Sequence, residues 1–323
     1  AFVKSVIDKT AKKIIKEATD GVTLDISALT DRQAAYTYVS NHRDIVLDSG
    51  LLSVMLVEQG LDTVEIAIGD NLLIYPWIKK LVRVNKSFIV QRALTMRQKL
   101  ESSARMSRYM HYTIRDKKQS IWIAQREGRA KDSDDRTQDS VLKMMAMGGE
   151  GDIIDRLSEL NIVPLSISYE FDPCDFLKAR EFQLKRDNPD YKKTQADDLQ
   201  NMQTGIFGYK GRVHFQTAPC INEALKSFDR SLPKPELFAR VSALLDAGIH
   251  ANYRLYPNNY VAHDLLTAAR EFASHYTEAD EKRFAAYLEQ QLSRIDLPGK
   301  DEDFLRTKLL QMYANPLTNY LKV

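Results

Sequence analysis

Apolar and polar residues alternate in blocks along the first two thirds of the chain. Six short blocks are rich in aromatic and β-branched residues, as is typical of strands buried in a sheet. Longer blocks with apolar residues at helical spacing follow some of them, such as SGLLSVMLVEQG over residues 49–60. This alternation predicts the α/β class, with a central, mostly parallel or mixed sheet flanked by helices. The predicted strands span residues 34–39, 63–68, 86–90, 120–125, 163–170 and 212–217.

The two ends of the chain have helical patterns. FVKSVIDKTAKKIIKEA, residues 2–18, has the pattern of a basic amphipathic helix. A strongly charged stretch over residues 178–204 predicts a helical, solvent-facing insertion before the last strand. Beyond residue 220, helical patterns are separated by prolines and polar breaks. We therefore divide the chain into an N-terminal amphipathic helical segment (1–33), an α/β domain (34–219) and a helical C-terminal subdomain (220–323).

Composition excludes several classes of protein. A chain of 323 residues with 44% hydrophobic content can bury a sizeable core. Lys and Arg number 46 against 44 Asp and Glu, so charge gives no sign of a nucleic-acid partner. Two cysteines, Cys174 and Cys220, are too few for a disulfide framework and fit a reducing compartment. No run approaches the roughly 20 apolar residues of a membrane-spanning helix, and no secretory leader is visible. We expect a cytoplasmic protein.

A histidine and several acids stand where the first predicted strand gives way to a helix. His42 is followed by Arg43, Asp44 and Asp48 in the stretch NHRDIVLD. A histidine held by a carboxylate can act as a general base, because the acid fixes its tautomer and stabilises the imidazolium. No serine or cysteine is placed as a nucleophile, which indicates that the substrate supplies the attacking hydroxyl. Either aspartate could be the partner of His42.

Other polar clusters also follow predicted strands. They are Gln91 with Arg92, the stretch from Arg126 to Gln138, and Tyr169 with Glu170. Since α/β proteins bind ligands beyond the carboxyl ends of their strands, we expect these clusters to face one crevice. Arginines in such a crevice bind phosphate through charge-assisted hydrogen bonds. No GxGxxG motif follows the first strand, which argues against a dinucleotide-dependent oxidoreductase.

Four of these stretches, taken in order, resemble a known family. They are NHRDIVLD, KSFIVQR, QREGRAK and VPLSISYE, which begin at residues 41, 86, 125 and 163. Together they are similar to the four motifs of the glycerolipid acyltransferases, the glycerol-3-phosphate and lysophosphatidate acyltransferase superfamily. The segment from Ile66 to Arg92 is most similar to the glycerol-3-phosphate branch. The resemblance covers about residues 34–218 and leaves both ends of the chain unassigned.

The resemblance implies roles for residues of the first motif. His42 matches the family's general base, which deprotonates the acceptor hydroxyl. The family usually places the orienting aspartate after four intervening residues, where this chain has Leu47. We favour Asp48, with Asp44 as the alternate, because a one-residue bulge is easily accommodated and Asp48 opens the next helix. Arg43 is a further candidate for substrate binding.

The other three motifs imply the remaining substrate-binding residues. Arg92 matches the contact to the acceptor phosphate, although Lys86 replaces the small residue often found at the start of that motif. Glu127 is expected to bind the acceptor and Arg129 to hold phosphate, with Arg126 replacing the usual proline. The matched residues of these motifs are Phe88 and Arg92, then Glu127, Gly128 and Arg129, and finally Pro164, which shapes the acyl-chain side of the pocket.

The implied activity is that of an acyltransferase in phospholipid biosynthesis. A fatty acyl group moves from acyl-CoA or acyl-acyl-carrier protein (acyl-ACP), as co-substrate, to the hydroxyl of glycerol 3-phosphate or a lysophospholipid. No metal and no cofactor are expected. The alternatives are an acyltransferase acting on a lyso-aminolipid, an acyl-thioester hydrolase in which His42 activates water, and a non-enzymatic lipid-binding protein.

Peripheral contact with an anionic membrane is a further hypothesis. It rests on the basic N-terminal helix and on LLIYPWIKKLV, residues 72–82, in which aromatic residues stand beside two lysines. The contact would be with the inner face of the cell membrane. The alternative is that both segments pack their apolar side chains against the protein core.

Overall fold

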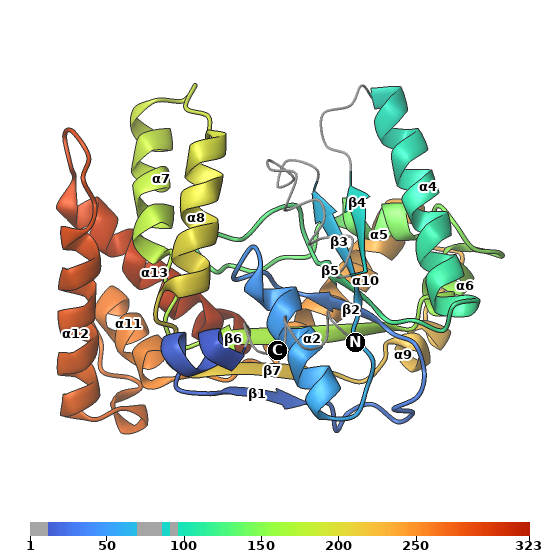
Figure 1. The fold of residues 1–323 in the computed structure, drawn as a ribbon, viewed down its shortest axis with the longest axis horizontal. Helices are drawn as coiled ribbons and strands as arrows, with labels where there is room; N and C mark the ends of the chain where they lie inside the picture. The colour runs from blue at the N-terminus through green and yellow to red at the C-terminus, as the bar shows by residue number, and fades with distance from the viewer. Residues whose placement is uncertain (1–11, 70–85, 91–95) are drawn as a thin grey trace.

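The computed structural model of the chain describes residues 12–69, 86–90 and 96–323 (Figure 1). The described strands form one seven-stranded sheet in the order β1-β7-β6-β2-β5-β3-β4. All six predicted strands are present. The prediction missed β1, which lies in the segment assigned to the N-terminal helix and pairs with β7. The strands are β1 (Val22–Asp25), β2 (Thr37–Ser40), β3 (Glu65–Gly69), β4 (Ser87–Val90), β5 (Ile121–Ala124), β6 (Ile162–Tyr169) and β7 (Val213–Thr217).

The sheet is mixed and mostly parallel, as predicted. Only the β6–β7 pair is antiparallel among the described strands. β2 lies between β5 and β6 and runs parallel to both, with Val39 opposite Ile123 and Pro164. The carboxyl ends of these three strands therefore meet at one edge of the sheet, which is where α/β proteins place their ligands.

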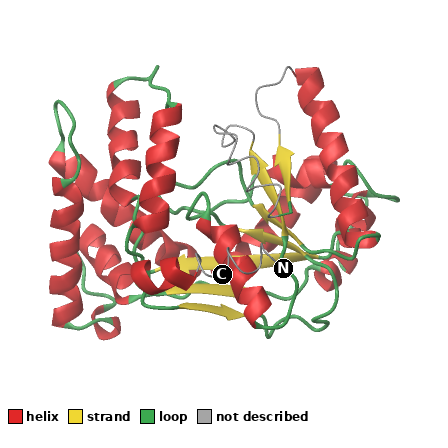
Figure 2. Ribbon diagram, in the orientation of Figure 1, coloured by secondary structure: helices red, strands yellow, loops and turns green. Residues whose placement is uncertain are grey.

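Helices cover both faces of the sheet (Figure 2). Tyr38 of β2 packs with the leucines of α2 on one face, whereas Val39 packs with residues of α4, α5 and α10 on the other. This alternation follows from the two-residue period of a strand. The helices are α2 (Leu47–Glu58), α4 (Met96–Arg115), α5 (Asp139–Met145), α6 (Ile153–Glu159), α7 (Asp175–Asp187), α8 (Gln195–Phe207), α9 (Asn222–Lys226), α10 (Lys234–His250), α11 (Pro257–Thr267), η2 (Ala273–His275), α12 (Glu278–Ser293) and α13 (Glu302–Tyr320).

The C-terminal residues are helical, as predicted, but they share their cores with the preceding part of the chain. Val241 and Leu245 of α10 belong to the core between the sheet and α4. A further core joins Leu177 of α7 to residues of α11, α12 and α13, such as Leu309. Residues 220–323 are thus packed both on the sheet and on α7, and α10 connects the two cores.

The charged stretch before β7 forms two helices, α7 and α8, which stand side by side in Figure 1. A capping box begins α8, because Thr194 Oγ1 accepts from the Asp197 N–H and the Asp197 carboxylate accepts from the Thr194 N–H. The helices are not simply solvent-facing, which corrects the prediction. Lys178 is 1% exposed and Asn201 is 7% exposed, so both helices turn polar side chains inward.

Only part of the two proposed membrane-contact segments is described. Residues 12–18 are helical, with Ile14 and Ile15 packed against the core beneath α2 and with Lys13 and Lys16 exposed. Residues 1–11 and the segment 72–82 lie outside the described residues. Within the described part of the chain, no helix has both the length and the apolar character needed to cross a membrane.

Candidate functional site

The site begins at Asn41, directly after β2. Its side chain bonds the backbone of Ile167 in β6 twice, through Nδ2 to the carbonyl oxygen at 2.9 Å and through Oδ1 from the N–H at 2.8 Å. The fully buried Asn41 thus replaces one step of strand pairing and fixes the direction in which the chain leaves the sheet. His42 follows at the carboxyl edge of the sheet, with its ring edge against Trp122 of β5 at 5.6 Å between centroids.

His42 and Asp48 form a hydrogen-bonded pair. His42 Nδ1 lies 2.8 Å from Asp48 Oδ2, and the same oxygen accepts from the Arg43 N–H at 2.6 Å. Asp48 is 0% exposed in the first turn of α2, whereas the His42 side chain retains 14% exposure. A carboxylate at Nδ1 favours the tautomer in which Nε2 is free to accept a proton. This geometry is that of a general base and its orienting acid.

Asp44, the alternate partner, has a different place. Its Oδ1 accepts from the N–H groups of Val46 and Leu47, each at 2.8 Å, at the start of α2. Burial and the nearby negative charge of Asp48 raise the pKa of Asp44. Asp44 therefore supports the helix start, and the structure places Asp48 rather than Asp44 against His42.

Tyr169, at the end of β6, lies beside this pair of acids. Burial, followed by the charges of Asp48 and Asp44, raises the pKa of Tyr169 well above its usual value. Within the described residues, neither the buried Tyr169 hydroxyl nor Asp48 Oδ1 has another partner. The hydroxyl is thus available to the carboxylate oxygen that His42 leaves free. Sequence reasoning named Tyr169 only as part of a strand-end cluster.

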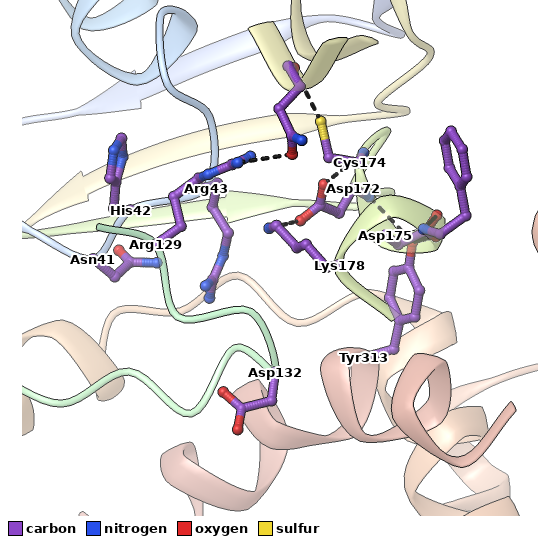
Figure 3. Close-up of polar contacts among 12 residues, drawn as sticks. Asn41, His42, Arg43, Arg129, Asp132, Asp172, Cys174, Asp175, Lys178 and Tyr313 are labelled. Atoms are coloured by element: carbon purple, nitrogen blue, oxygen red, sulfur yellow. Dashed lines mark hydrogen bonds and ion pairs between the residues drawn. The ribbon is translucent and has the colours of Figure 1, made fainter. Parts of the chain in front are cut away.

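The loop after β5 carries the third motif. Gly128 has a φ of +71°, in the left-handed region that glycine adopts without strain. Glu127 is exposed, and its backbone N–H donates to Gln138 Oε1 at 2.8 Å. Arg129 donates from one Nη to Asn201 Oδ1 in α8 at 2.8 Å (Figure 3). Burial alone would lower the pKa of Arg129, but Cys174, Asp172 and Asp44 together raise it, so the guanidinium stays charged.

Arg43 is occupied inside the protein. Its guanidinium donates to both carboxylate oxygens of Asp135, at 3.1 and 2.7 Å, and it is only 6% exposed. Asp135 also accepts from the Tyr253 hydroxyl at 2.5 Å, and its carbonyl oxygen lies 2.9 Å from His250 Nε2. Arg43, predicted to bind substrate, therefore ties the His42 loop to the loop after β5 and to the end of α10.

The remaining residues of the resemblance lie farther out or are not described. Pro164 is buried in β6, and a Cβ added to Gly248 of α10 would come within 2.8 Å of its ring. Phe88 of β4 is partly buried and packs edge-on against Tyr109 of α4, with 5.3 Å between ring centroids. Arg92 lies outside the described residues.

A polar cluster that sequence reasoning missed follows β6. Asp172 forms a buried ion pair with Lys178 (Figure 3). Asp175 accepts from the hydroxyls of Tyr287 and Tyr313, each at 2.7 Å. Burial raises the pKa of Asp175 to about 7, against the hydrogen bonds from the tyrosines. The sequence could have indicated this cluster, because both acids come shortly after a predicted strand.

Neither a metal centre nor a thiol nucleophile is indicated. In the chain as described, no group of three or more His, Cys, Asp and Glu side chains converges as a metal site requires. Burial raises the pKa of the Cys174 thiol to about 12, so it is protonated at neutral pH and a poor nucleophile.

Part of the chain is similar to a known protein family. No curated protein matches the sequence. A similar solved structure is the 1-acyl-sn-glycerophosphate (LPA) acyltransferase, PlsC, from Thermotoga maritima, which is 12% identical over 75% of this chain and 76% of that chain, with a TM-score of 0.42. That score is too low to support a conclusion about shared geometry. Residues 22–168, which contain His42, Asp48 and the Glu127–Arg129 loop, match the family model described as Acyltransferase. Residues 22–168, somewhat under half of the chain, thus match the acyltransferase family, in agreement with the acyltransferase resemblance of the motifs.

Proposed function

We propose that this protein transfers a fatty acyl group from acyl-CoA or acyl-ACP to the hydroxyl of glycerol 3-phosphate or a lysophospholipid. The observation that carries the proposal is the His42–Asp48 pair, with 2.8 Å between Nδ1 and Oδ2. A buried carboxylate that orients a partly exposed histidine at the carboxyl edge of the sheet is the arrangement that general-base catalysis requires.

The reaction proceeds by two proton transfers and one displacement. His42 Nε2 takes the proton of the acceptor hydroxyl as that oxygen attacks the thioester carbonyl carbon. Asp48 stabilises the imidazolium that forms, through the hydrogen bond at Nδ1. When the tetrahedral intermediate collapses, the carbon–sulfur bond breaks and the leaving thiolate takes the proton from the imidazolium, which releases the thiol and restores neutral His42.

The other matched residues bind the two substrates. Arg129 contributes a charged guanidinium for the acceptor phosphate, and Arg92 acts with it. Glu127 and Gly128 form the loop that receives the acceptor, because the left-handed turn at Gly128 leaves Glu127 exposed. Pro164 is expected to shape the acyl-chain side of the pocket, and Phe88 is a further candidate for substrate binding. Arg43 supports the site from within, through Asp135.

Acceptor-dependent thiol release tests the proposal. We expect the protein to release CoA from palmitoyl-CoA when glycerol 3-phosphate or lysophosphatidate is added. His42→Ala is expected to lower this rate by about 10²- to 10⁴-fold, the usual contribution of a general base. His275→Ala, at an exposed histidine in η2, serves as the matched control and is expected to retain the wild-type rate.

Other outcomes would identify the alternatives. Release that requires His42 but no acceptor would mean an acyl-thioester hydrolase. If the protein acylates a lyso-aminolipid and no phosphorylated acceptor, the proposed acyl-transfer reaction is correct and the proposed acceptor is wrong. The absence of His42-dependent release with either CoA or carrier-protein donors would contradict the proposed activity.

Peripheral contact with the inner face of the cell membrane forms part of the proposal. The exposed Lys13 and Lys16 of the N-terminal helix support it, since basic side chains attract anionic lipid head groups. Flotation with anionic vesicles is expected to carry the intact protein at low salt and to weaken at moderate salt, because salt screens the attraction. A protein that stays unbound at both salt concentrations would contradict membrane contact.

A further inference from the structure

Helix α8 packs directly against the His42 loop. Gly205 faces Asp44, and a Cβ added at Gly205 would collide with the Asp44 carboxylate. The backbone of α8 therefore approaches the loop at a distance that only glycine permits. One turn earlier, Asn201 is 7% exposed and turned toward Arg129. The helix that was predicted to face solvent thus contacts two loops of the site.

The side chain of Asn201 is held in one orientation. Its Nδ2 donates to the Asp197 carbonyl oxygen of the preceding turn at 2.8 Å, which leaves Oδ1 to accept from Arg129 at 2.8 Å. The backbone carbonyl oxygen of Asn201 lies 3.3 Å from Cys174 Sγ, at the start of α7. Each polar group of this side chain therefore has a defined partner, and the Arg129 guanidinium meets a rigid acceptor.

Arg129 retains a donor and a full positive charge. Its Nη1 is buried without a partner among the described residues, although a buried guanidinium N–H strongly favours an acceptor. Asn201 is neutral, so it positions the guanidinium without cancelling its charge. Of the nearby acids, Asp172 is already paired with Lys178, and Asp44 accepts from two backbone N–H groups at the start of α2. The net positive charge is thus available to an anionic ligand.

We propose that Asn201 is a positioning residue that aims Arg129 at the phosphate of the acyl acceptor, so that α8 contributes to the binding of phosphorylated acceptors. This inference rests on the proposed function. It predicts that Asn201 affects acceptor binding, and that it affects neither the acyl donor nor the chemical step at His42.

Equilibrium binding of glycerol 3-phosphate, measured by calorimetry, tests the inference without requiring turnover. Asn201→Ala is expected to weaken binding about tenfold, as the loss of one hydrogen bond to a charged group does. Asn201→Asp is expected to weaken it further, because the new carboxylate pairs with Arg129 and competes with the phosphate. Gln203→Ala, at an exposed position on the same helix, is the matched control and is expected to bind as the wild type does.

Two kinetic measurements separate positioning from a structural role. In acyl transfer, Asn201→Ala is expected to raise KM for glycerol 3-phosphate about tenfold, with kcat and KM for palmitoyl-CoA unchanged. In an Arg129→Ala background, the same substitution is expected to have no further effect on KM, since the residue it positions is gone. Thermal unfolding of Asn201→Asp, which keeps an acceptor oxygen, controls for folding.

The outcomes distinguish this inference from the proposed function. If the wild type binds glycerol 3-phosphate and Asn201→Ala binds it equally well, the positioning role is overturned while acyl transfer stands. If binding depends on Asn201 but no thioester is consumed, the proposed reaction fails and the phosphate site remains. A wild type that does not bind glycerol 3-phosphate overturns the inference.

Discussion

Asp48→Asn isolates the contribution of negative charge to the proposed base. Both hydrogen bonds at Asp48, from His42 Nδ1 and from the Arg43 N–H, go to the same oxygen, Oδ2. An asparagine with its amide oxygen at that place keeps both bonds and removes only the charge. Asp48 is fully buried, so solvent does not replace what is lost.

The expected loss follows from the interaction of the carboxylate with the imidazolium formed during the reaction. Two unit charges about 4 Å apart, at an effective dielectric constant of about 20, attract by about 4 kcal/mol. A loss of this size in transition-state stabilisation lowers kcat by about 10³-fold. The hydrogen bond of 2.8 Å indicates that the charges are at least this close. We therefore expect Asp48→Asn to fold normally and to be about a thousandfold slower.

Asp44→Asn is the matched control. Asp44 accepts from Val46 and Leu47 through one oxygen, which an amide also supplies, and it does not contact His42. We expect its kcat to stay within about threefold of the wild type. The assay is acceptor-dependent release of CoA at neutral pH, with thermal unfolding of each variant. Equal losses in the two variants, or a loss under tenfold for Asp48→Asn, would refute the reasoning.

The remaining predictions concern stability and a neighbour of the catalytic pair. Gly205→Ala is expected to lower the free energy of unfolding by about 1–3 kcal/mol in urea titrations, because its Cβ collides with Asp44, whereas Gly50→Ala, with open space at its Cβ, is expected to be neutral or stabilising. Asp175 has a pKa of about 7 in the folded protein, so between about pH 4 and pH 7 the folded state binds more protons there than the unfolded state does. The contribution of Asp175 to the free energy of unfolding therefore falls progressively as pH rises through this range. Asp175→Asn is therefore expected to gain stability relative to the wild type between pH 5 and pH 8, and a constant difference between the two proteins would contradict this. Tyr169→Phe is expected to lower kcat about three- to tenfold without changing KM, since it removes the buried hydroxyl that is available to the free oxygen of Asp48; an unchanged kcat would show that the hydroxyl does not support the carboxylate.

The sequence by itself determined the fold class and the position of His42, the proposed base. The six predicted strands are visible as local runs of apolar residues, which can be recognised without knowing their partners in the sheet. His42 was singled out because it comes directly after one of these runs. β1 was missed because its four residues have no distinctive pattern apart from the pairing with β7, which is about 190 residues away along the chain. Short strands of this kind depend on their neighbours in the sheet.

Only the tertiary structure decided which charged side chains serve the site. Arg43 looked like a free cation beside His42, but Asp135, 92 residues later, occupies it. Asn201 lies in a charged stretch that predicts a solvated surface, and nothing local marks it as the partner of Arg129. The choice between Asp44 and Asp48 likewise depended on where α2 begins. Motif spacing indicates which residues share a strand end, whereas pairing between polar groups depends on contacts distant in sequence, which a local pattern does not encode.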